Sequence, residues 1–196
     1  MFYEEPVRSD PMPAPESAAV NWTGAYGGVL GDLTFLRGSF VTNGNPHGTT
    51  VAERFVGAFA GYQQQLSNNV VLGVEASAKY GLDRIPYDRF GVGSKMWTDW
   101  GGTIRARVGY AFDRALIYAT GGWGVQRNWV DSTVTGKDSD TQGGYVLGLG
   151  IEYAMTDTVF GRFEYEYADF PKKQVSSFTE ADLATHTFTV GIGTRF

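Results

Sequence analysis

The sequence predicts an all-β fold, an eight-stranded antiparallel up-and-down transmembrane β-barrel with short periplasmic turns and four longer extracellular loops. Three observations predict it. Segments along the chain alternate apolar and polar residues with a period of two, which is typical of strands whose two faces meet different surroundings. Short polar turns alternate with long polar stretches. Aromatic residues stand at both ends of the apolar faces, as in the girdles of barrels that span a membrane.

The clearest strand runs from Trp100 to Tyr110. One face carries small and apolar residues between these two aromatics, whereas the other face carries Arg105 and Arg107. A tilted barrel strand climbs about 2.5 Å per residue, so the segment spans about 25 Å, the height of a lipid-facing band. We therefore expect the apolar face to contact lipid and both arginines to point into a narrow lumen.

Composition limits the other possibilities. The chain of 196 residues is long enough for one domain, and without cysteine it has neither a disulfide framework nor a Cys-ligated metal site. A net charge of −5 argues against electrostatic binding of nucleic acid. No uncharged run reaches the roughly 18–20 residues that a spanning helix needs. A chain of this kind can enter a membrane only as a closed barrel, because closure satisfies every strand hydrogen bond in lipid.

The chain divides into two parts. Residues 1–20 are rich in proline and acids, which predicts a flexible periplasmic leader or a segment that attaches to something in the periplasm. Residues 21–196 are expected to form the barrel. The alternating segments are 23–36, 54–66, 70–81, 98–112, 115–128, 143–155, 158–170 and 184–196. The fifth alternates least clearly, and the last ends in the terminal phenylalanine.

The connections are of two kinds. The tight turns are 65–69, 113–114 and 156–157. The long polar stretches are 37–53, 82–97, 129–142 and 171–183. This asymmetry is typical of bacterial outer-membrane barrels, whose long loops lie outside the cell, and an even number of strands puts both termini on the periplasmic side.

The aromatic residues form two predicted rings when odd strands run outward and even strands run inward. The inner ring contains Tyr62, Tyr110, Tyr153 and Phe196. The outer ring contains Phe35, Tyr80, Trp100, Tyr145 and Tyr167. A soluble barrel has no reason to show two such rings.

The opposite face of the strands gathers charged residues. They are Glu75, Lys79, Arg105, Arg107, Glu152, Arg162, Glu164, Glu166 and Arg195. An eight-stranded barrel is only wide enough for side chains to fill, and an unpaired buried charge costs several kcal/mol. We expect a salt-bridge network that sets the register and closes the pore, with a path for protons or small ions as the alternative. No catalytic residue, cofactor or metal is expected.

The two histidines raise two further alternatives. His47, with Phe40 nearby, is a candidate ligand for haem in the first loop, although an ordinary surface histidine explains it too. His186 precedes the last apolar face and follows Ser176 and Ser177, a combination that a lipid acyl hydrolase at the barrel rim could use. A soluble barrel of lipocalin type is a structural alternative, which would bury the apolar faces and expose the charged ones.

Several short stretches in a fixed order carry a family resemblance. They are Asn21–Gly28, Gly61–Gln63, Gly73–Glu75, Arg105–Phe112, Tyr118–Gly122, Gly150–Tyr153, Glu164–Phe170 and the ending from His186 to Phe196. Through them the chain resembles the alphaproteobacterial outer-membrane immunogenic protein family, small porin-like barrels with the architecture of OmpA and OmpX. It departs from the family at Ala25 and Thr194, where the family is more aromatic.

The resemblance implies a location in the Gram-negative outer membrane, in contact with its lipid and lipopolysaccharide. It implies delivery by the barrel-assembly machinery through the C-terminal Phe196, and a role in envelope integrity and surface exposure without a catalytic residue. Some relatives are described as haemin-binding or weakly pore-forming. Others are attached to peptidoglycan by their N-termini, which makes residues 1–20 a candidate tether.

Overall fold

The structure is a computed structural model that describes residues 20–42, 45–83, 86–87, 94–132, 136–170 and 181–196. Within these ranges every regular element is a β-strand. The strands are β1 (Gly24–Thr42), β2 (Asn45–Gln65), β3 (Val70–Gly81), β4 (Pro86–Tyr87), β5 (Ser94–Phe112), β6 (Ala115–Ser132), β7 (Gly136–Ala154), β8 (Val159–Phe170) and β9 (Ala181–Arg195). Among the described residues no helix is long and apolar enough to span a membrane.

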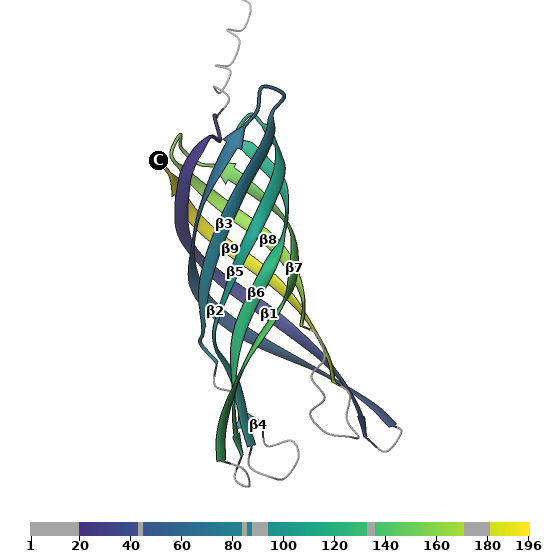
Figure 1. The fold of residues 1–196 in the computed structure, drawn as a ribbon. Helices are drawn as coiled ribbons and strands as arrows, with labels where there is room; N and C mark the ends of the chain where they lie inside the picture. The colour runs from purple at the N-terminus through teal and green to yellow at the C-terminus, as the bar shows by residue number, and fades with distance from the viewer. Residues whose placement is uncertain (1–19, 43–44, 84–85, 88–93, 133–135, 171–180) are drawn as a thin grey trace, which may run out of the picture.

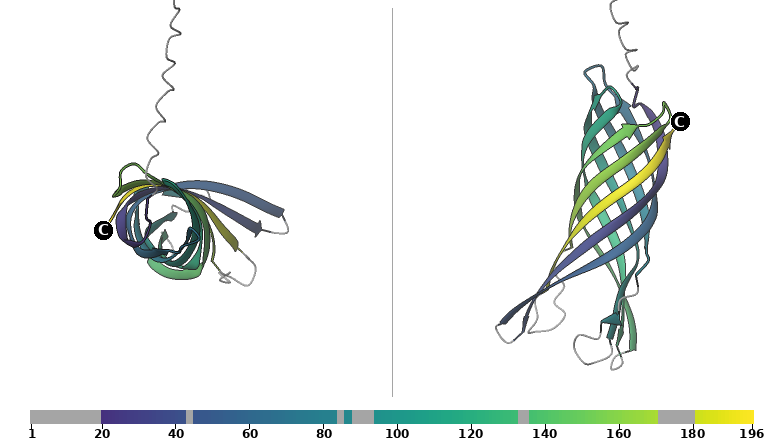
Figure 2. Two further views of the ribbon diagram at one scale, coloured as in Figure 1. Left: turned by 90° about the horizontal axis from the view of Figure 1, so that it is seen from above. Right: turned by 180° about the vertical axis from the view of Figure 1, so that it is seen from behind.

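The long strands form one closed antiparallel barrel (Figure 1). Neighbours in sequence pair with each other, β1 pairs with β9, and the β3–β5 pairing closes the ring, which the view along the axis in Figure 2 shows. The two-residue β4 only extends the edge of β5. The eight long strands of the described ranges thus confirm the predicted up-and-down barrel.

The two faces of the strands lie as the alternation predicts. Ile104 on β5 points outward and is 73% exposed, whereas the adjacent Arg105 points inward and is 3% exposed. The same contrast separates Leu149, which is exposed, from the fully buried Glu152 on β7. The lipocalin-type alternative, with the apolar faces inside, is therefore wrong.

We call the two ends of the barrel the turn end and the hairpin end. The turn end carries the short connections after β2, β5 and β7, which correspond to the predicted turns. Asn69 and Asp113 adopt positive φ angles of 65° and 47° there, a conformation that Asn and Asp tolerate better than most residues. Val20 N–H donates to Asp113 O and Phe196 N–H donates to Ala25 O, so the described chain begins and ends at the turn end.

Except for β3 and β8, the strands extend further at the hairpin end than predicted. β1 and β2 pair as far as Thr42 and Asn45, and β6 and β7 pair as far as Ser132 and Gly136. The predicted loops 37–53, 82–97, 129–142 and 171–183 therefore contain strand residues, including all of β4. A two-stranded ribbon that runs past the ring has no interior, so its sequence need not alternate although its backbone ladder continues.

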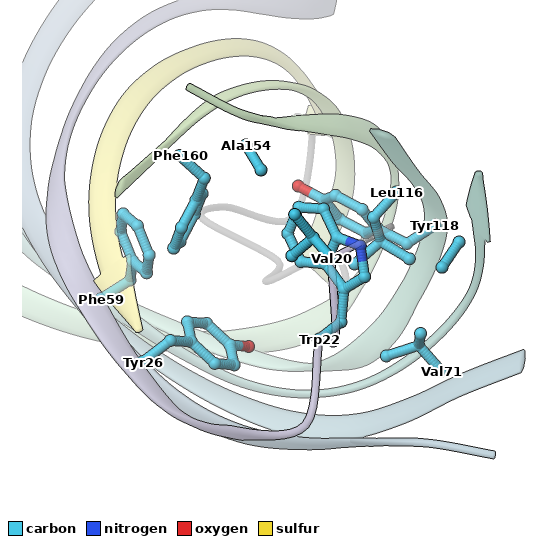
Figure 3. Close-up of a cluster of buried hydrophobic side chains, with 10 residues drawn as sticks. Val20, Trp22, Tyr26, Phe59, Val71, Leu116, Tyr118, Ala154 and Phe160 are labelled. Carbon is cyan, nitrogen blue, oxygen red and sulfur yellow. The ribbon is translucent and has the colours of Figure 1, made fainter. Parts of the chain in front are cut away.

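A hydrophobic cluster fills the barrel near the turn end (Figure 3). Its members are Val20, Trp22, Tyr26, Phe59, Val71, Ala111, Leu116, Tyr118, Ala154 and Phe160. Inward-facing glycines make room for the rings: a Cβ on Gly150 would lie 2.5 Å from Cζ of Tyr118, and one on Gly61 would lie 2.5 Å from the Tyr26 hydroxyl. The interior of the barrel is therefore packed with side chains at this level.

Candidate functional site

The candidate site is an ion-pair network inside the barrel, between the hydrophobic cluster and the hairpin end. Strand alternation turns its residues inward, and register sets two pairs directly opposite each other. Glu75 on β3 faces Arg105 on β5, and Glu152 on β7 faces Arg162 on β8. Opposite charges at directly paired positions approach each other without any change of the backbone.

Glu75 is the centre of the network. Its Oε1 accepts hydrogen bonds from Nη2 of Arg105 at 2.6 Å and Nη1 of Arg162 at 3.0 Å. Its Oε2 accepts from Nη2 of Arg162 at 2.6 Å, from the Tyr26 hydroxyl at 2.9 Å and from Nη1 of Arg107 at 3.4 Å. One carboxylate thus joins three arginines, and hydrogen bonds to charged groups are the strong ones.

The other carboxylates accept hydrogen bonds from Nη and Nε atoms of the same three arginines. Glu152 Oε1 accepts from Nη2 of Arg107 at 3.0 Å and from Nη2 of Arg162 at 2.6 Å. Arg105 Nη1 donates to Glu164, and to Oε2 of Glu166 at 2.9 Å. The charges therefore form a continuous network from β3 across the lumen to β8, and each charge of this network has a partner of opposite sign.

Lys79 forms a second group toward the hairpin end. Its Nζ lies 3.2 Å from Asp32 Oδ2 and 3.9 Å from Glu166 Oε1. Thr189 donates a hydrogen bond to Asp32 Oδ1 at 2.7 Å. A small cavity of about 10 Å³ lies beside Lys79 and Thr103, with room for roughly one water molecule.

Aromatic rings complete the network. The guanidinium carbon of Arg107 lies 3.9 Å from the ring centre of Tyr118, and that of Arg162 lies 4.0 Å from the ring centre of Phe59. The Tyr118 hydroxyl also donates to Glu164 Oε2 at 2.7 Å. Cation–π contacts of this kind strengthen when they are shielded from water.

Three members of the network were not predicted from the sequence: Asp32, Tyr26 and Tyr118. The alternation does indicate that these three side chains point inward, because each has the inward phase of its own strand. Tyr26 and Tyr118 read as ordinary strand aromatics, and Asp32 is an isolated acid in a glycine-rich segment. Their partners come from distant parts of the chain, so spacing alone did not reveal them.

Arg195 does not join the network, contrary to the prediction. Its Nη1 donates to the Asn21 carbonyl at 3.0 Å, and its Nη2 donates to the Asp157 carbonyl at 2.6 Å. Its guanidinium carbon lies 4.5 Å from the ring centre of Trp22. Arg195 is the last residue of β9, so it reaches the turn end rather than the level of Glu75.

The predicted girdle residues all lie on the outward phase of their strands. Seven are exposed: Tyr62, Tyr80, Trp100, Tyr110, Tyr145, Tyr153 and Phe196. Phe35 and Tyr167 are half-buried, because Phe35 packs against Phe188 and Tyr167 packs against His186.

The histidine alternatives gain no support. His186 lies on the outer face, where its Nδ1 is 2.7 Å from the Tyr165 hydroxyl. Ser176 and Ser177 lie outside the described residues, as does the side chain of His47. Within the described part of the chain, no group of His, Cys, Asp or Glu side chains is placed to hold a metal ion.

One ion pair lies apart from the network, at the hairpin end. Arg54 Nη2 is 2.6 Å from Asp83 Oδ1, and Asp83 also accepts from the Arg54 backbone N–H at 2.8 Å. These hydrogen bonds hold the pKa of the Asp83 carboxyl below its ordinary value. Arg54 is largely exposed, so the pair contributes little to stability and provides a contrast to the buried arginines.

Comparison with known proteins identifies the family. The model of the outer membrane protein beta-barrel domain family matches residues 12–196. The 31 kDa outer-membrane immunogenic protein of Brucella melitensis is 34% identical over 97% of this chain and 91% of its own length. The 22 kDa outer membrane protein of Rhizobium leguminosarum is 32% identical over 93% of this chain and 82% of its own length. The resemblance read from the sequence is thereby confirmed.

Two solved structures share the architecture. Neisserial surface protein A aligns with a TM-score of 0.57 and 16% identity, covering 88% of this chain and 99% of its own. Ail, the attachment invasion locus protein of Yersinia pestis, aligns with a TM-score of 0.55 and 14% identity, covering 89% and 99%. At such low identity these likenesses concern the fold alone.

Proposed function

Because the chain belongs to the outer membrane protein beta-barrel domain family, we propose that it is a non-enzymatic barrel whose lumen is plugged by its own paired charges. Like its relatives it is a protein of the Gram-negative outer membrane. In this proposal the barrel contributes to envelope integrity and presents its long hairpins outside the cell, with both termini in the periplasm.

The observation that carries the plug is the pairing of Glu75 with Arg105 and Arg107 of the adjacent strand β5 and with Arg162 of β8 across the lumen. An ion that crossed the barrel would have to break these contacts. Opening even one buried pair leaves an uncompensated charge, which costs about 3–5 kcal/mol. A passive plug of this kind needs no cofactor and no moving part.

A structural role also agrees with the chemistry of the interior. The carboxylates that could act as acids or bases are held by guanidinium groups or by Lys79. The cavity beside Lys79 has a volume of about 10 Å³, too small for a substrate. The relatives quoted above are named as outer-membrane and immunogenic proteins, names that mention no catalytic activity.

The proposed partners follow from the outer surface and the two termini. The exposed apolar faces and aromatic rings suit contact with outer-membrane lipid and lipopolysaccharide. Phe196 is exposed, and we propose it as the contact with the barrel-assembly machinery. Residues 1–20 are the candidate attachment to peptidoglycan.

Planar-bilayer recording tests the plug. We expect the purified protein to give no stable conductance. The variant Trp22→Ala/Glu75→Ala/Arg105→Ala/Arg162→Ala removes the centre of the network together with Trp22 of the hydrophobic cluster and should leak, whereas Ile104→Ala on the outer face should behave as the parent. A large, reproducible channel in the unmodified protein would contradict the proposal.

A further inference from the structure

The side chains of Val20 and Trp22 lie inside the barrel, although both residues precede the first strand, whereas Asn21 and Thr23 are exposed. Trp22 has no exposed surface, and Val20 is buried as well. Figure 3 shows both side chains within the ring of strands, beside Leu116 and Tyr118. A segment that only connects to a strand would instead run over the protein surface.

This segment is held by hydrogen bonds to two turns. Val20 N–H donates to the Asp113 carbonyl at 3.0 Å, in the turn between β5 and β6. Trp22 N–H donates to Gln65 Oε1 at 2.9 Å, and Gln65 N–H donates to Thr23 Oγ1 at 3.0 Å, at the end of β2. The segment therefore crosses the opening of the barrel at the turn end.

Side chains of β8 and β9 complete the contact. The Trp22 ring packs edge-on against Phe160 of β8, with ring centres 6.3 Å apart. Arg195 at the end of β9 covers the Trp22 ring at 4.5 Å and donates to the Asn21 carbonyl. Residues from β8 and β9 thus contact the segment in addition to Gln65 of β2.

The exposure of the network depends on the distance from this segment. The side chains of Glu152 and Glu75 are 0% and 1% exposed, whereas those of Glu166 and Lys79 are 10% and 18% exposed. The small cavity lies on the Lys79 side as well, lined by Ser77, Thr103 and Thr189. Water therefore approaches the described part of the network from the hairpin end.

We propose that residues 20–23 form a stopper that seals the lumen at the turn end and makes it a blind vestibule, open toward the hairpins. Trp22 is its sealing side chain and Arg195 its clamp. The stopper continues directly from the residues that precede it. A partner that binds those residues and pulls on them would therefore also pull on Trp22. The stopper rests on the plug proposed above, and it concerns the access of water to the lumen rather than the flow of ions through it.

The absence of cysteine allows a direct test with single thiol reporters. Ala154→Cys places a thiol inside the barrel at the level of Trp22, where Ala154 is fully buried. Ser77→Cys places a thiol beside the cavity on the far side of Glu75. The rate of reaction with a charged, water-soluble methanethiosulfonate is measured for each reporter in the folded full-length protein.

Trp22→Ala should accelerate labelling of the Ala154→Cys reporter by about tenfold or more, because the reagent then reaches the thiol without prior local unfolding of residues 20–23. Labelling of the Ser77→Cys reporter should not change, because the ion-pair network lies between Ser77 and the site of Trp22. The control Trp123→Ala removes an exposed tryptophan of the outer face and should change neither rate.

An unchanged rate for the Ala154→Cys reporter in Trp22→Ala would overturn the stopper. Equal acceleration of both reporters would also overturn it, because that result indicates general loosening of the barrel. A fold check by mobility of the unheated protein on a denaturing gel accompanies each variant. If Trp22→Ala does not fold, Trp22→Leu replaces it with the same expected order of rates. Conductance that appears in Trp22→Ala but not in the parent protein would refute the plug while leaving the stopper intact.

Discussion

At the scale of single residues, Glu75 shows how the interior depends on individual side chains. It is almost fully buried and accepts hydrogen bonds from Arg105, Arg107 and Arg162 as well as from Tyr26. In such a site each charge is tolerated only because the others are present. The loss of one charged residue therefore leaves its partners buried without an opposite charge.

Arg105→Leu should lower the free energy of unfolding by about 3–5 kcal/mol, because it leaves Glu164 and Glu166 without their shared guanidinium group. Denaturant unfolding of the protein in lipid vesicles measures the change. Arg54→Leu is the matched control, since the Arg54–Asp83 pair is exposed and its loss should have little effect. An unfolding midpoint for Arg105→Leu equal to that of the control would contradict the pairing.

On the outer face, by contrast, the introduction of a charge should destabilise the barrel. Ile104 is exposed on β5, near the middle of the span between the girdle residues Trp100 and Tyr110. Ile104→Arg should therefore lower the free energy of unfolding by about 2–4 kcal/mol, the cost of an arginine near the middle of the bilayer. The same unfolding measurement checks it, with Ile104→Ala as the control for lost volume. A neutral result for Ile104→Arg would mean that Ile104 does not face lipid.

At the scale of elements, alternation predicts a strand only where its two faces differ. It identified 70–81 with the bounds that β3 has, because Glu75 points inward while its neighbours point outward. It missed the outer part of β2, which continues to Asn45, because polar residues there occupy both phases. Residues 45–53 of β2 are therefore predicted as loop from the sequence, although they pair fully with β1.

The hairpins and the turns should lie on opposite sides of the membrane. A single thiol from Gly48→Cys lies on the β1–β2 hairpin, and one from Ser67→Cys lies in the turn before β3. A membrane-impermeant maleimide should label the first reporter on intact cells, and the second only after the outer membrane is permeabilised. The reverse pattern would place the termini outside the cell and contradict the proposed orientation.

At the scale of the whole molecule, the fold was more predictable than the site. Period-two alternation, turn spacing and the position of aromatics are local, and they were enough to predict an antiparallel barrel. The partners of Glu75 are not local, because Arg162 follows 87 residues later on a strand across the lumen. The alternation predicts that such residues point into the barrel, but it does not predict at which level along the barrel axis they contact each other.

Two features of the interior had no signal in the pattern. Arg195 shares the inward phase with the network, yet its position at the end of β9 brings it to the Asn21 carbonyl instead. Trp22 precedes the first strand, so no alternation covers it, and its burial depends on the closed ring that forms around it. Both depend on the relative heights of strands, which only the closed barrel defines.

The central claim is that the apolar face contacts lipid while the lumen excludes it. Tryptophan fluorescence quenched by brominated lipid tests this with natural reporters, because Trp123 lies on the outer face and Trp22 in the lumen. Two chains are compared, each retaining one of these residues, with the other four of the five tryptophans replaced by phenylalanine. The account predicts strong quenching of Trp123 and little quenching of Trp22, whereas strong quenching of Trp22 with Trp123 unaffected would contradict it.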